Sequence, residues 1–410
     1  MRMRSGRPHV VVFDENLPVP LDRRVWQEAR ALVSAGYRVT IISPRGSGEM
    51  AGLVETREGI RILRYPQRAA SGLAGYFVEY APSMVFSTIW LLALRLRGRI
   101  DVVHGCNPPD LFFLLCRLAG LWGARYVFDQ HDANPELAVA KWGARRSGRI
   151  LARLTRALER ASYATASIVI VPNDSYARIA AERGAVSEER IVVVRNAPPG
   201  DGFRGLAAGI APPTDGSLRI GYLGVMGSQD GVEILLDAVA DLREIAPDLR
   251  VELDLVGDGE ARPALEARAA DLGIAGLVRF HGYQAPDAFA PILAATHVCV
   301  SPDPPSPFND VSTMTKIVEY LAIGRPVIAF ALAETSLVLG GAGVIIGEAT
   351  ASALASELAR LAGDRPRLDA MTAAAGRRID ELDLRWERSA ERLLAAYESL
   401  LGTEGRASSA

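Results

Sequence analysis

The sequence predicts an α/β protein with two doubly wound parallel sheets. Short apolar segments alternate with amphipathic helical segments along most of the chain, as in parallel strands joined by helices. A stretch rich in Gly and Pro, residues 197–217, separates two such series. With 410 residues, 49% of them hydrophobic, and a mean hydropathy of +0.12, the chain can bury two cores.

The first series contains two expected helices, and the residues at the ends of one of them define it. Asp22 can cap a helix from residue 23 to about 35, and Gly36 ends it. A second helix is expected over 111–119. The expected strands of this series are 9–13, 37–42, 100–104, 125–128, 167–171 and 191–195. The longest apolar run, 81–94, is too short to cross a bilayer by itself.

The second series starts after the Gly- and Pro-rich stretch. Its expected strands are 218–223, 250–256, 277–281, 297–300 and 326–329. The predicted organisation is a first domain at 1–197, a linker at 198–217, a second domain at 218–380, a helix at 381–402 packing back on the first domain, and a polar tail at 403–410.

A short helix in the second series carries a polar face. Apolar residues at 314, 317, 318 and 321 form its core face, Ser312 or Thr313 can cap it, and Gly324 ends it. Lys316 and Glu319 share another face, one turn apart, and Lys316 is one of only two lysines in the chain. Polar side chains here suit a ligand site, and the alternative is a surface salt bridge on an amphipathic helix.

Three glycine-containing loops follow successive strands of the second series. Gly224, Gly227 and Ser228 follow the first strand, and residues 255–260 and 281–284 follow the next two. Because the carboxyl ends of parallel strands lie at one edge of a sheet, these loops are expected to converge. Backbone N–H groups beside a helix start favour an anion, so a phosphate-bearing ligand is predicted. The alternative is that the glycines only satisfy turn geometry.

Several motifs resemble, in order and spacing, those of the family 4 retaining glycosyltransferases. In the second half they are L-V-G-D-G-E-A-R-P-A-L-E, V-R-F-H-G-Y and K-I-V-E-Y-L-A-I-G-R-P-V-I-A. In the first half they are D-R-R-V-W-Q-E-A-R-A-L-V-S-A-G-Y, D-V-V-H-G-C-N-P-P-D, V-F-D-Q-H-D-A-N-P-E and I-V-V-V-R-N-A-P. The resemblance covers residues 10–400. It implies the GT-B fold, in which two Rossmann-like domains face each other across a cleft.

The resemblance implies how a nucleotide-diphosphate sugar donor is held. Glu319 matches the second glutamate of the family's E-x7-E motif, which contacts the donor ribose, whereas the first glutamate is replaced by Val311, next to Asp310. Asp230 stands where the family places a lysine after the glycine turn, which leaves Lys316 as the substitute cation. The implied donor-binding residues are Gly224, Gly227, Ser228, Gly257, Tyr283, Asp310, Lys316 and Glu319.

The implied catalytic residues are His131, Lys316 and Glu319. His131 matches the family histidine that lies near the donor sugar, and its alternative role is a structural hydrogen bond at a strand end. Asp132 and Glu136, in the same loop, either cap it or bind the acceptor. The sequence has no D-x-D triplet, and the resemblance implies transfer without a metal or a cofactor.

These features predict a retaining, metal-independent glycosyltransferase. Backbone N–H groups at Gly227 and Ser228, with Lys316, would stabilise the negative charge that grows on the β-phosphate as the sugar leaves. The expected acceptor is lipid-linked or a polysaccharide, in envelope or exopolysaccharide synthesis. Two other functions stay open: a nucleotide-sugar 2-epimerase with this fold, and a partner subunit that binds the donor without turning it over.

The charge is divided unequally between the two halves of the chain. Residues 1–197 carry 28 Lys and Arg against 18 Asp and Glu, whereas residues 198–410 carry 18 against 30, and the whole chain has a net charge of −2. Arg149, Arg153, Arg156 and Arg160 line one helical face. This face predicts binding to an anionic membrane surface, and the alternative is a solvated helix.

Other partners and the compartment follow from what the sequence contains. No nucleic-acid-binding motif accompanies the arginines, so nucleic acid is not expected. Three cysteines without C-x-x-C spacing, and a first strand without a preceding apolar signal, favour a cytoplasmic protein. It is expected to be free there or peripheral on the inner face of the cell membrane.

Overall fold

The computed structural model describes residues 7–46, 48–67, 72–143, 146–198, 202–227 and 229–402. The chain divides into two compact units. One consists of residues 1–195 with 389–410, and the other of residues 196–388. Each unit has its own sheet and its own core, and each is a doubly wound α/β sheet, as the sequence predicts.

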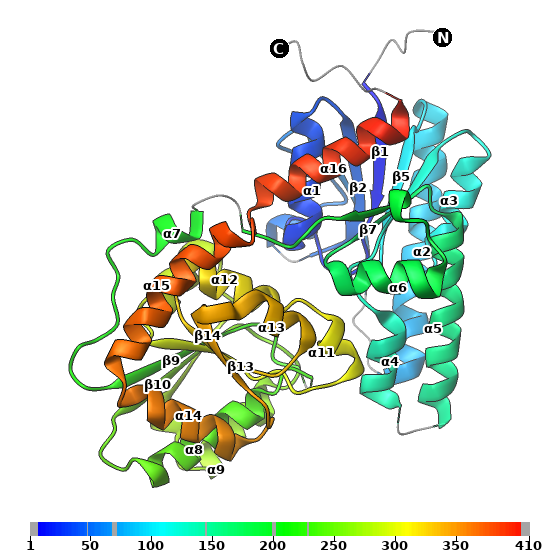
Figure 1. Ribbon diagram of the computed structural model, residues 1–410. Helices are drawn as coiled ribbons and strands as arrows, with labels where there is room; N and C mark the ends of the chain where they lie inside the picture. Colours follow the sequence, from blue (N-terminus) through cyan, green and yellow to red (C-terminus); the bar gives the residue numbers. More distant parts are fainter. Residues whose placement is uncertain are drawn as a thin grey trace. The chain divides into compact units, whose positions relative to one another are not determined.

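The sheet of the first unit is parallel apart from one edge strand (Figure 1). Its order is β3-β4-β2-β1-β5-β6-β7-β8, and β3 is antiparallel to β4. The strands are β1 (His9–Phe13), β2 (Arg38–Pro44), β3 (Val54–Arg57), β4 (Ile60–Tyr65), β5 (Val102–Cys106), β6 (Arg125–Asp129), β7 (Ile168–Val171) and β8 (Ile191–Val193). The order reverses between β1 and β5, so the loops after these two strands diverge there.

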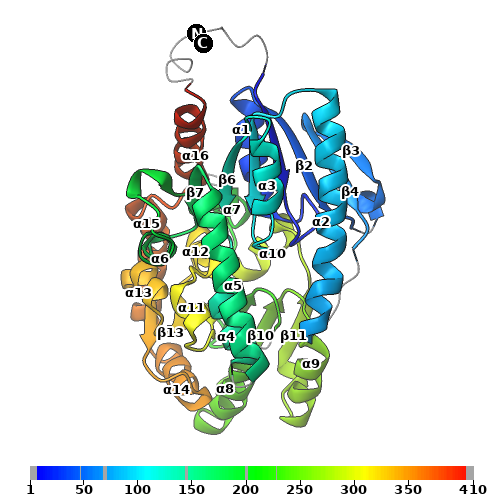
Figure 2. The ribbon, with the colours of Figure 1, turned by 90° about the vertical axis from the view of Figure 1, so that its right-hand side faces the viewer.

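Helices cover both faces of this sheet. They are α1 (Arg23–Ser34), α2 (Gly72–Arg97), α3 (Phe113–Gly120), α4 (Asn134–Trp142), α5 (Arg146–Thr165), α6 (Asp174–Gly184) and the C-terminal α16 (Trp386–Leu401). The described residues of this unit also form two 3-10 turns, Gly48–Ala51 and Glu188–Arg190. α2, α3 and α5 lie on one face, and α1 and α16 lie on the other (Figures 1 and 2).

Side-chain contacts explain where α1 starts and why α16 packs on the first unit. The Asp22 carboxylate accepts a hydrogen bond from Val25 N (3.0 Å), which caps α1 as predicted. Tyr397 of α16 packs edge-on against Tyr37, with ring centroids 5.7 Å apart, and its hydroxyl hydrogen-bonds His104 Nδ1 (2.7 Å). These contacts fix α16 on the first unit.

The sheet of the second unit is parallel throughout, in the order β11-β10-β9-β12-β13-β14. The strands are β9 (Leu218–Leu223), β10 (Val251–Val256), β11 (Val278–Gly282), β12 (Val298–Ser301), β13 (Val327–Phe330) and β14 (Gly343–Ile346). The helices are α7 (Gly202–Leu206), α8 (Val232–Ile245), α9 (Arg262–Asp271), α10 (Pro286–Ala294), α11 (Pro307–Val311), α12 (Thr315–Ile323), α13 (Ala333–Leu339), α14 (Ala351–Ala362) and α15 (Arg365–Glu381). Two 3-10 turns are Ala275–Leu277 and Gly340–Ala342.

Two local features differ from the sequence pattern. The helix expected to start near Ser312 starts at Thr315, because Ser312 instead ends α11 and its hydroxyl donates to Phe308 O (2.8 Å). Part of the stretch expected as a linker is helix α7, because Phe203 is buried there against Phe289, with ring centroids 5.4 Å apart. The predicted end of α12 is confirmed: Gly324 is its left-handed C-cap.

In the described part of the chain, no helix combines the length and the apolar character that crossing a membrane requires.

Candidate functional site

The second unit brings its polar loops together at the point where the strand order reverses. This point lies between β9 and β12, where doubly wound sheets bind their ligands. The loop after β9 is tied to the loop after β10 by hydrogen bonds from Gly224 N to Val256 O (3.0 Å) and from Met226 N to Asp258 O (3.0 Å). Gly257 N donates in turn to Gly282 O, at the end of β11 (2.9 Å).

The close approach of these loops requires glycine. Gly257 has φ +130°, and a Cβ atom there would lie 1.8 Å from Gly224 O. A Cβ atom at Gly224 would lie 3.2 Å from Cε of Lys316, so the glycine turn lies directly beside the lysine. Both glycines therefore have a structural role, and their contact with a donor stays a prediction.

Lys316 is buried at the start of α12 between two carboxylates. Its Nζ donates to Asp303 Oδ1 (2.8 Å), lies 3.8 Å from Asp230 Oδ1, and lies 4.9 Å from the centre of the Tyr222 ring. Burial alone would lower the pKa of Lys316, but Asp303 and Asp230 outweigh it and raise the pKa. The ammonium is therefore charged and already paired with carboxylates of this chain, and its role as the substitute cation for a donor phosphate stays a prediction.

Asp230 also binds the backbone N–H of Gly227, which the sequence predicts as a donor to phosphate. Its Oδ2 accepts a hydrogen bond from Gly227 N (3.0 Å), and Asp230 N donates back to Gly227 O (3.2 Å). One carboxylate thus binds the Gly227 N–H and lies near the Lys316 ammonium. A phosphate at this position has to displace Asp230, because both would use the same groups.

The remaining predicted donor residues have different surroundings. Glu319 is buried in α12, one turn beyond Lys316. Tyr283 is exposed in the loop after β11. Asp310 Oδ1 accepts from Ala333 N (3.1 Å), so this carboxylate is bound at the start of α13. Ser228 lies outside the described residues.

In the first unit, His131 follows β6 and is held by its neighbours. Its Nε2 lies 2.6 Å from Asp129 Oδ2, and its backbone N–H donates to Asn107 Oδ1 (2.6 Å). Burial alone would lower the pKa of His131, but the Asp129 carboxylate raises it to about 9. The imidazole is therefore a fixed cation at neutral pH.

Asp129 is the centre of a buried ionic network. The Arg24 guanidinium contacts both of its oxygens, at 2.7 and 3.2 Å, and donates to Val194 O (2.7 Å). Burial by itself would raise the pKa of Asp129, but Arg24 and His131 hold it well below its usual range. The carboxylate stays ionised and orients both cations.

Glu28 and His104 extend this network toward α16. His104 Nε2 lies 3.3 Å from Asp129 Oδ2 and 3.5 Å from Glu28 Oε2, and its Nδ1 bonds the Tyr397 hydroxyl. Burial, together with the charge of Asp129, raises the pKa of Glu28 to about 7. Through Tyr397, the C-terminal helix α16 therefore contacts His104. His104 in turn lies beside Asp129, the carboxylate that binds His131.

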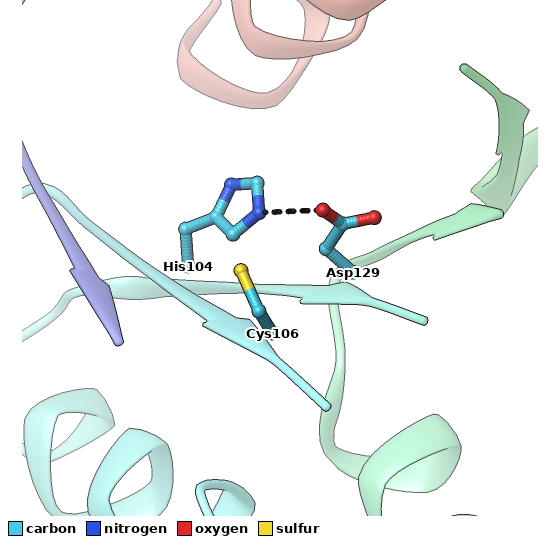
Figure 3. Close-up of side chains that lie close together, drawn as sticks. All are labelled: His104, Cys106 and Asp129. Atoms are coloured by element: carbon cyan, nitrogen blue, oxygen red, sulfur yellow. Dashed lines mark ion pairs between the residues drawn. The ribbon is translucent and has the colours of Figure 1, made fainter. Parts of the chain in front are cut away.

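Figure 3 shows His104, Cys106 and Asp129 pointing toward one another from β5 and β6. Their ligand atoms lie within 4.8 Å of one another, a cluster that their sequence spacing did not predict. They do not fit a metal centre, because Arg24 already binds both Asp129 oxygens and burial raises the pKa of the Cys106 thiol well above its usual range. His104 and Asp129 belong to the ionic network, and the neutral Cys106 thiol lies beside it.

Sequence reasoning missed several members of these clusters. Asp129 and Asp303 each stand at or just after the carboxyl end of an apolar strand, and this position could have identified them. Asp14 follows β1 in the same way; its carboxyl is buried, and its Oδ2 has no hydrogen-bond partner among the described residues. Burial raises the pKa of Asp14 well above its usual range. For Arg24 and Glu28, only their i,i+4 spacing in the sequence indicates that they could pair, and nothing indicates that they join a site.

Two family models match successive parts of the chain. Residues 21–197 match the family described as "Glycosyl transferase 4-like domain", and residues 217–364 match "Glycosyl transferases group 1". The chain belongs to the family 4 glycosyltransferases. It is therefore an enzyme that transfers sugars, and the resemblance found in its motifs is confirmed.

Two curated relatives are similar to this glycosyltransferase over most of its length. The D-inositol 3-phosphate glycosyltransferase of Corynebacterium urealyticum is 25% identical over 397 residues, which cover 91% of this chain and 88% of the relative. The 2-deoxystreptamine glucosyltransferase of Streptomyces kanamyceticus is 26% identical over 408 residues, which cover 93% and 99%.

Solved structures show that this glycosyltransferase has the GT-B fold. Sucrose-phosphate synthase from Thermosynechococcus elongatus aligns with a TM-score of 0.76 and 19% identity, over 97% of this chain and 100% of the other. WaaG, a glycosyltransferase involved in lipopolysaccharide biosynthesis, gives 0.69 and 18%, over 94% and 99%. Anabaena HepE in complex with UDP-glucose gives 0.67 and 17%, over 95% and 99%.

Proposed function

We propose that this glycosyltransferase moves a sugar from a nucleoside-diphosphate sugar to a lipid-linked or polysaccharide acceptor, with retention of configuration and without a metal. The observation that carries the proposal is the cluster around Lys316 at the reversal point between β9 and β12. A buried cation, a glycine turn and the start of α8 lie together there, and each favours a diphosphate. The UDP-glucose complex of HepE, which has the same fold, agrees with such a donor.

Departure of the sugar leaves negative charge on the β-phosphate. Lys316 and the Gly227 N–H are donors at fixed positions in the fold that would stabilise this charge. Asp230 has to leave the N–H for this to happen, so donor binding is coupled to a rearrangement of its carboxylate. Glu319, one turn further along α12, would bind the ribose hydroxyls.

The first unit would bind the acceptor at its own reversal point, between β1 and β5. The His131 imidazolium, held by Asp129, adds a positive charge near this edge of the sheet. The unpaired oxygen of Asp14 can bind an acceptor hydroxyl, because a buried polar atom without a partner is costly. Glu136 is a weaker candidate, since both of its oxygens contact Arg183, at 2.5 and 3.2 Å.

A membrane-linked acceptor agrees with the basic face of α5. Arg149, Arg153, Arg156 and Arg160 are all exposed, and none makes an ion pair with a described carboxylate. Unpaired exposed cations on one helix face attract anionic lipid headgroups. The similarity to WaaG, a glycosyltransferase involved in lipopolysaccharide biosynthesis, favours the same class of acceptor.

One observation favours a second function, a partner subunit that binds the donor without turnover. Two carboxylates, Asp303 and Asp230, surround the one ammonium of the cluster and reduce its ability to stabilise a phosphate. Such a subunit would bind the donor but form no product with any acceptor. A 2-epimerase would instead change the sugar in the absence of an acceptor.

The test is a thermal-shift panel of UDP-, GDP- and ADP-sugars, followed by product analysis with the donor that raises the unfolding temperature most. We expect one nucleotide to stabilise the protein and its sugar to reach a lipid-linked acceptor in the presence of EDTA. Proton NMR of the product should show the anomeric configuration of the donor. Stabilisation by no nucleotide sugar, or an inverted product, would contradict the proposal.

A further inference from the structure

Helix α2 is apolar on two opposite faces, and the first unit covers only one of them. The covered face packs against β2 and β4. The opposite face carries Val85, Ile89, Leu92 and Leu96, spaced i, i+4, i+7 and i+11, which we call the α2 stripe. These side chains are 56, 53, 42 and 89% exposed. Four large apolar side chains in a row on one helix face indicate contact with an apolar medium.

The surface around the α2 stripe is basic. Eight exposed arginines lie on α2, α3 and α5: Arg95, Arg97, Arg117, Arg146, Arg149, Arg153, Arg156 and Arg160. In α3, in α5 and between Tyr80 and Arg97 of α2, the only acidic residue is Glu159, which is buried and pairs with Arg183. Figures 1 and 2 show the three helices along the same face of the sheet.

Further apolar side chains continue this surface from α2 to α5. Leu121, just after α3, is 81% exposed, and Ile150 and Leu154 of α5 are exposed beside the arginines. The Arg95 guanidinium lies over the Trp122 ring, 5.7 Å from its centroid, which joins the end of α2 to the end of α3. Aliphatic, tryptophan and arginine side chains in one surface are typical of proteins that bind at the lipid–water interface.

We propose that the α2 stripe inserts among the acyl chains of an anionic bilayer, with α2 in the plane of the interface and the surrounding arginines on lipid phosphates. The proposal rests on the proposed function in one respect, since it specifies how the enzyme reaches a membrane-linked acceptor. A second copy of this chain is a poorer occupant. Two such surfaces would bring arginines against arginines, with no exposed carboxylate on these segments to pair with them.

The test uses the salt dependence of vesicle binding to separate insertion of the α2 stripe from attraction between the arginines and anionic lipids. The full chain is cosedimented with vesicles of phosphatidylcholine and about 30% phosphatidylglycerol, at low salt and at about 0.5 M salt, where charges are screened beyond about 4 Å. We expect part of the wild-type binding to survive high salt. Ile89→Gln with Leu96→Gln should remove that part and lower the vesicle partition coefficient about tenfold or more. The control, Ile245→Gln with Leu337→Gln, changes two residues of the second unit that are 51 and 61% exposed, and it should bind as wild type.

A second readout places the stripe in the bilayer. A polarity-sensitive fluorophore on Leu96→Cys should gain fluorescence with vesicles, whereas the same label on Leu337→Cys should not; the three native cysteines are buried. Equal vesicle binding of wild type and the Ile89/Leu96 variant would overturn the inference and leave the proposed function intact. Dimerisation that this variant abolishes, without vesicle binding by the wild type, would assign the stripe to a second copy. Donor binding measured on the same variants reports separately on the proposed function.

Discussion

The His131 imidazole lies 2.6 Å from the carboxylate of Asp129, which the Arg24 guanidinium also binds through both oxygens. A single buried anion therefore fixes two cations, one in helix α1 and one at the end of β6. This arrangement makes His131 an oriented group that is charged at neutral pH, which is a stronger role than a strand-end hydrogen bond requires.

Replacing His131 by Gln should lower turnover and also change how stability depends on pH. The folded pKa is raised from 6.5 to about 9, so the charged pair stabilises the fold fully below about pH 6.5 and the effect is lost as the pH rises through about 9. At about 1.4 kcal/mol per pH unit, the loss is on the order of 3 kcal/mol. Urea unfolding of wild type and variant between pH 6 and 9 measures it.

Wild type and His131→Gln have to be compared because Glu28 also makes the free energy of unfolding depend on pH. Its pKa is also raised, to about 7, so it too removes stability as the pH rises, between about 4.5 and 7. The loss above pH 7 should therefore disappear in His131→Gln, while the loss below pH 7 remains. Parallel stability curves for the two proteins above pH 7 would show that His131 is uncharged.

Lys316→Met should reduce kcat more than it raises KM for the donor, because the charge that Lys316 faces grows in the transition state. It should also destabilise the protein by about 3–5 kcal/mol, since it leaves the buried Asp303 carboxylate unpaired. The double variant Lys316→Met/Asp303→Asn controls for this loss and should regain most of the stability but not the turnover. Wild-type kcat in the double variant would assign phosphate stabilisation to the backbone alone.

Asp230→Asn should bind nucleoside diphosphates more tightly than wild type. The amide can still accept from Gly227 N, but it no longer repels a phosphate, so we expect a gain of about 1 kcal/mol. Calorimetry with the nucleoside diphosphate and with the free nucleoside separates the contribution of the phosphates from that of the nucleoside. The free nucleoside should bind wild type and Asp230→Asn equally. Asp237→Asn, on α8 beside Arg268, controls for the change in net charge. Equal diphosphate affinity in all three proteins would place the phosphates away from Gly227.

Replacing Arg149, Arg153, Arg156 and Arg160 together by Glu should abolish the salt-sensitive part of vesicle binding, since each cation near an anionic surface contributes about 1 kcal/mol. Donor affinity should be unchanged, because these residues lie in the first unit and the proposed donor residues other than His131 lie in the second. Cosedimentation and donor calorimetry on one preparation measure both. Undiminished cosedimentation would leave the α5 arginines as a solvated helix face.

The sequence predicts the sheets well because their strands are continuous apolar runs, and buried parallel strands need little else. β1 and β9 match the expected residues throughout, and the ends of the nine other expected strands differ by at most two residues. No strand is predicted from the sequence at β3, β4 or β14. The edge strand β3 alternates between half-buried and exposed residues and has no comparable signal. The start of α12 was misplaced because Ser312 serves the preceding short helix, and no pattern over a few residues separates these two roles.

Some residues of the candidate site could be identified from the sequence, but the partners that they contact could not. Lys316 and Glu319 stand out in the sequence, whereas the partners of Lys316 come from loops 13 and 86 positions away, at Asp303 and Asp230. Asp230 was visible as a departure from the family lysine, yet its bond to Gly227 depends on the local turn. The Asp129 network joins α1, β5, β6 and α16, and such long-range pairing requires the fold.

Calorimetric titration of Glu319→Ala tests whether the second unit binds a nucleotide sugar through α12. With the nucleotide sugar that stabilises the wild type most, we expect the variant to bind about 1–3 kcal/mol more weakly, because ribose hydroxyls lose a buried partner. Glu244→Ala, exposed on α8, is the matched control and should bind as wild type. Equal affinity in wild type and Glu319→Ala, or no binding of any nucleotide sugar to the wild type, would show that α12 does not hold such a donor.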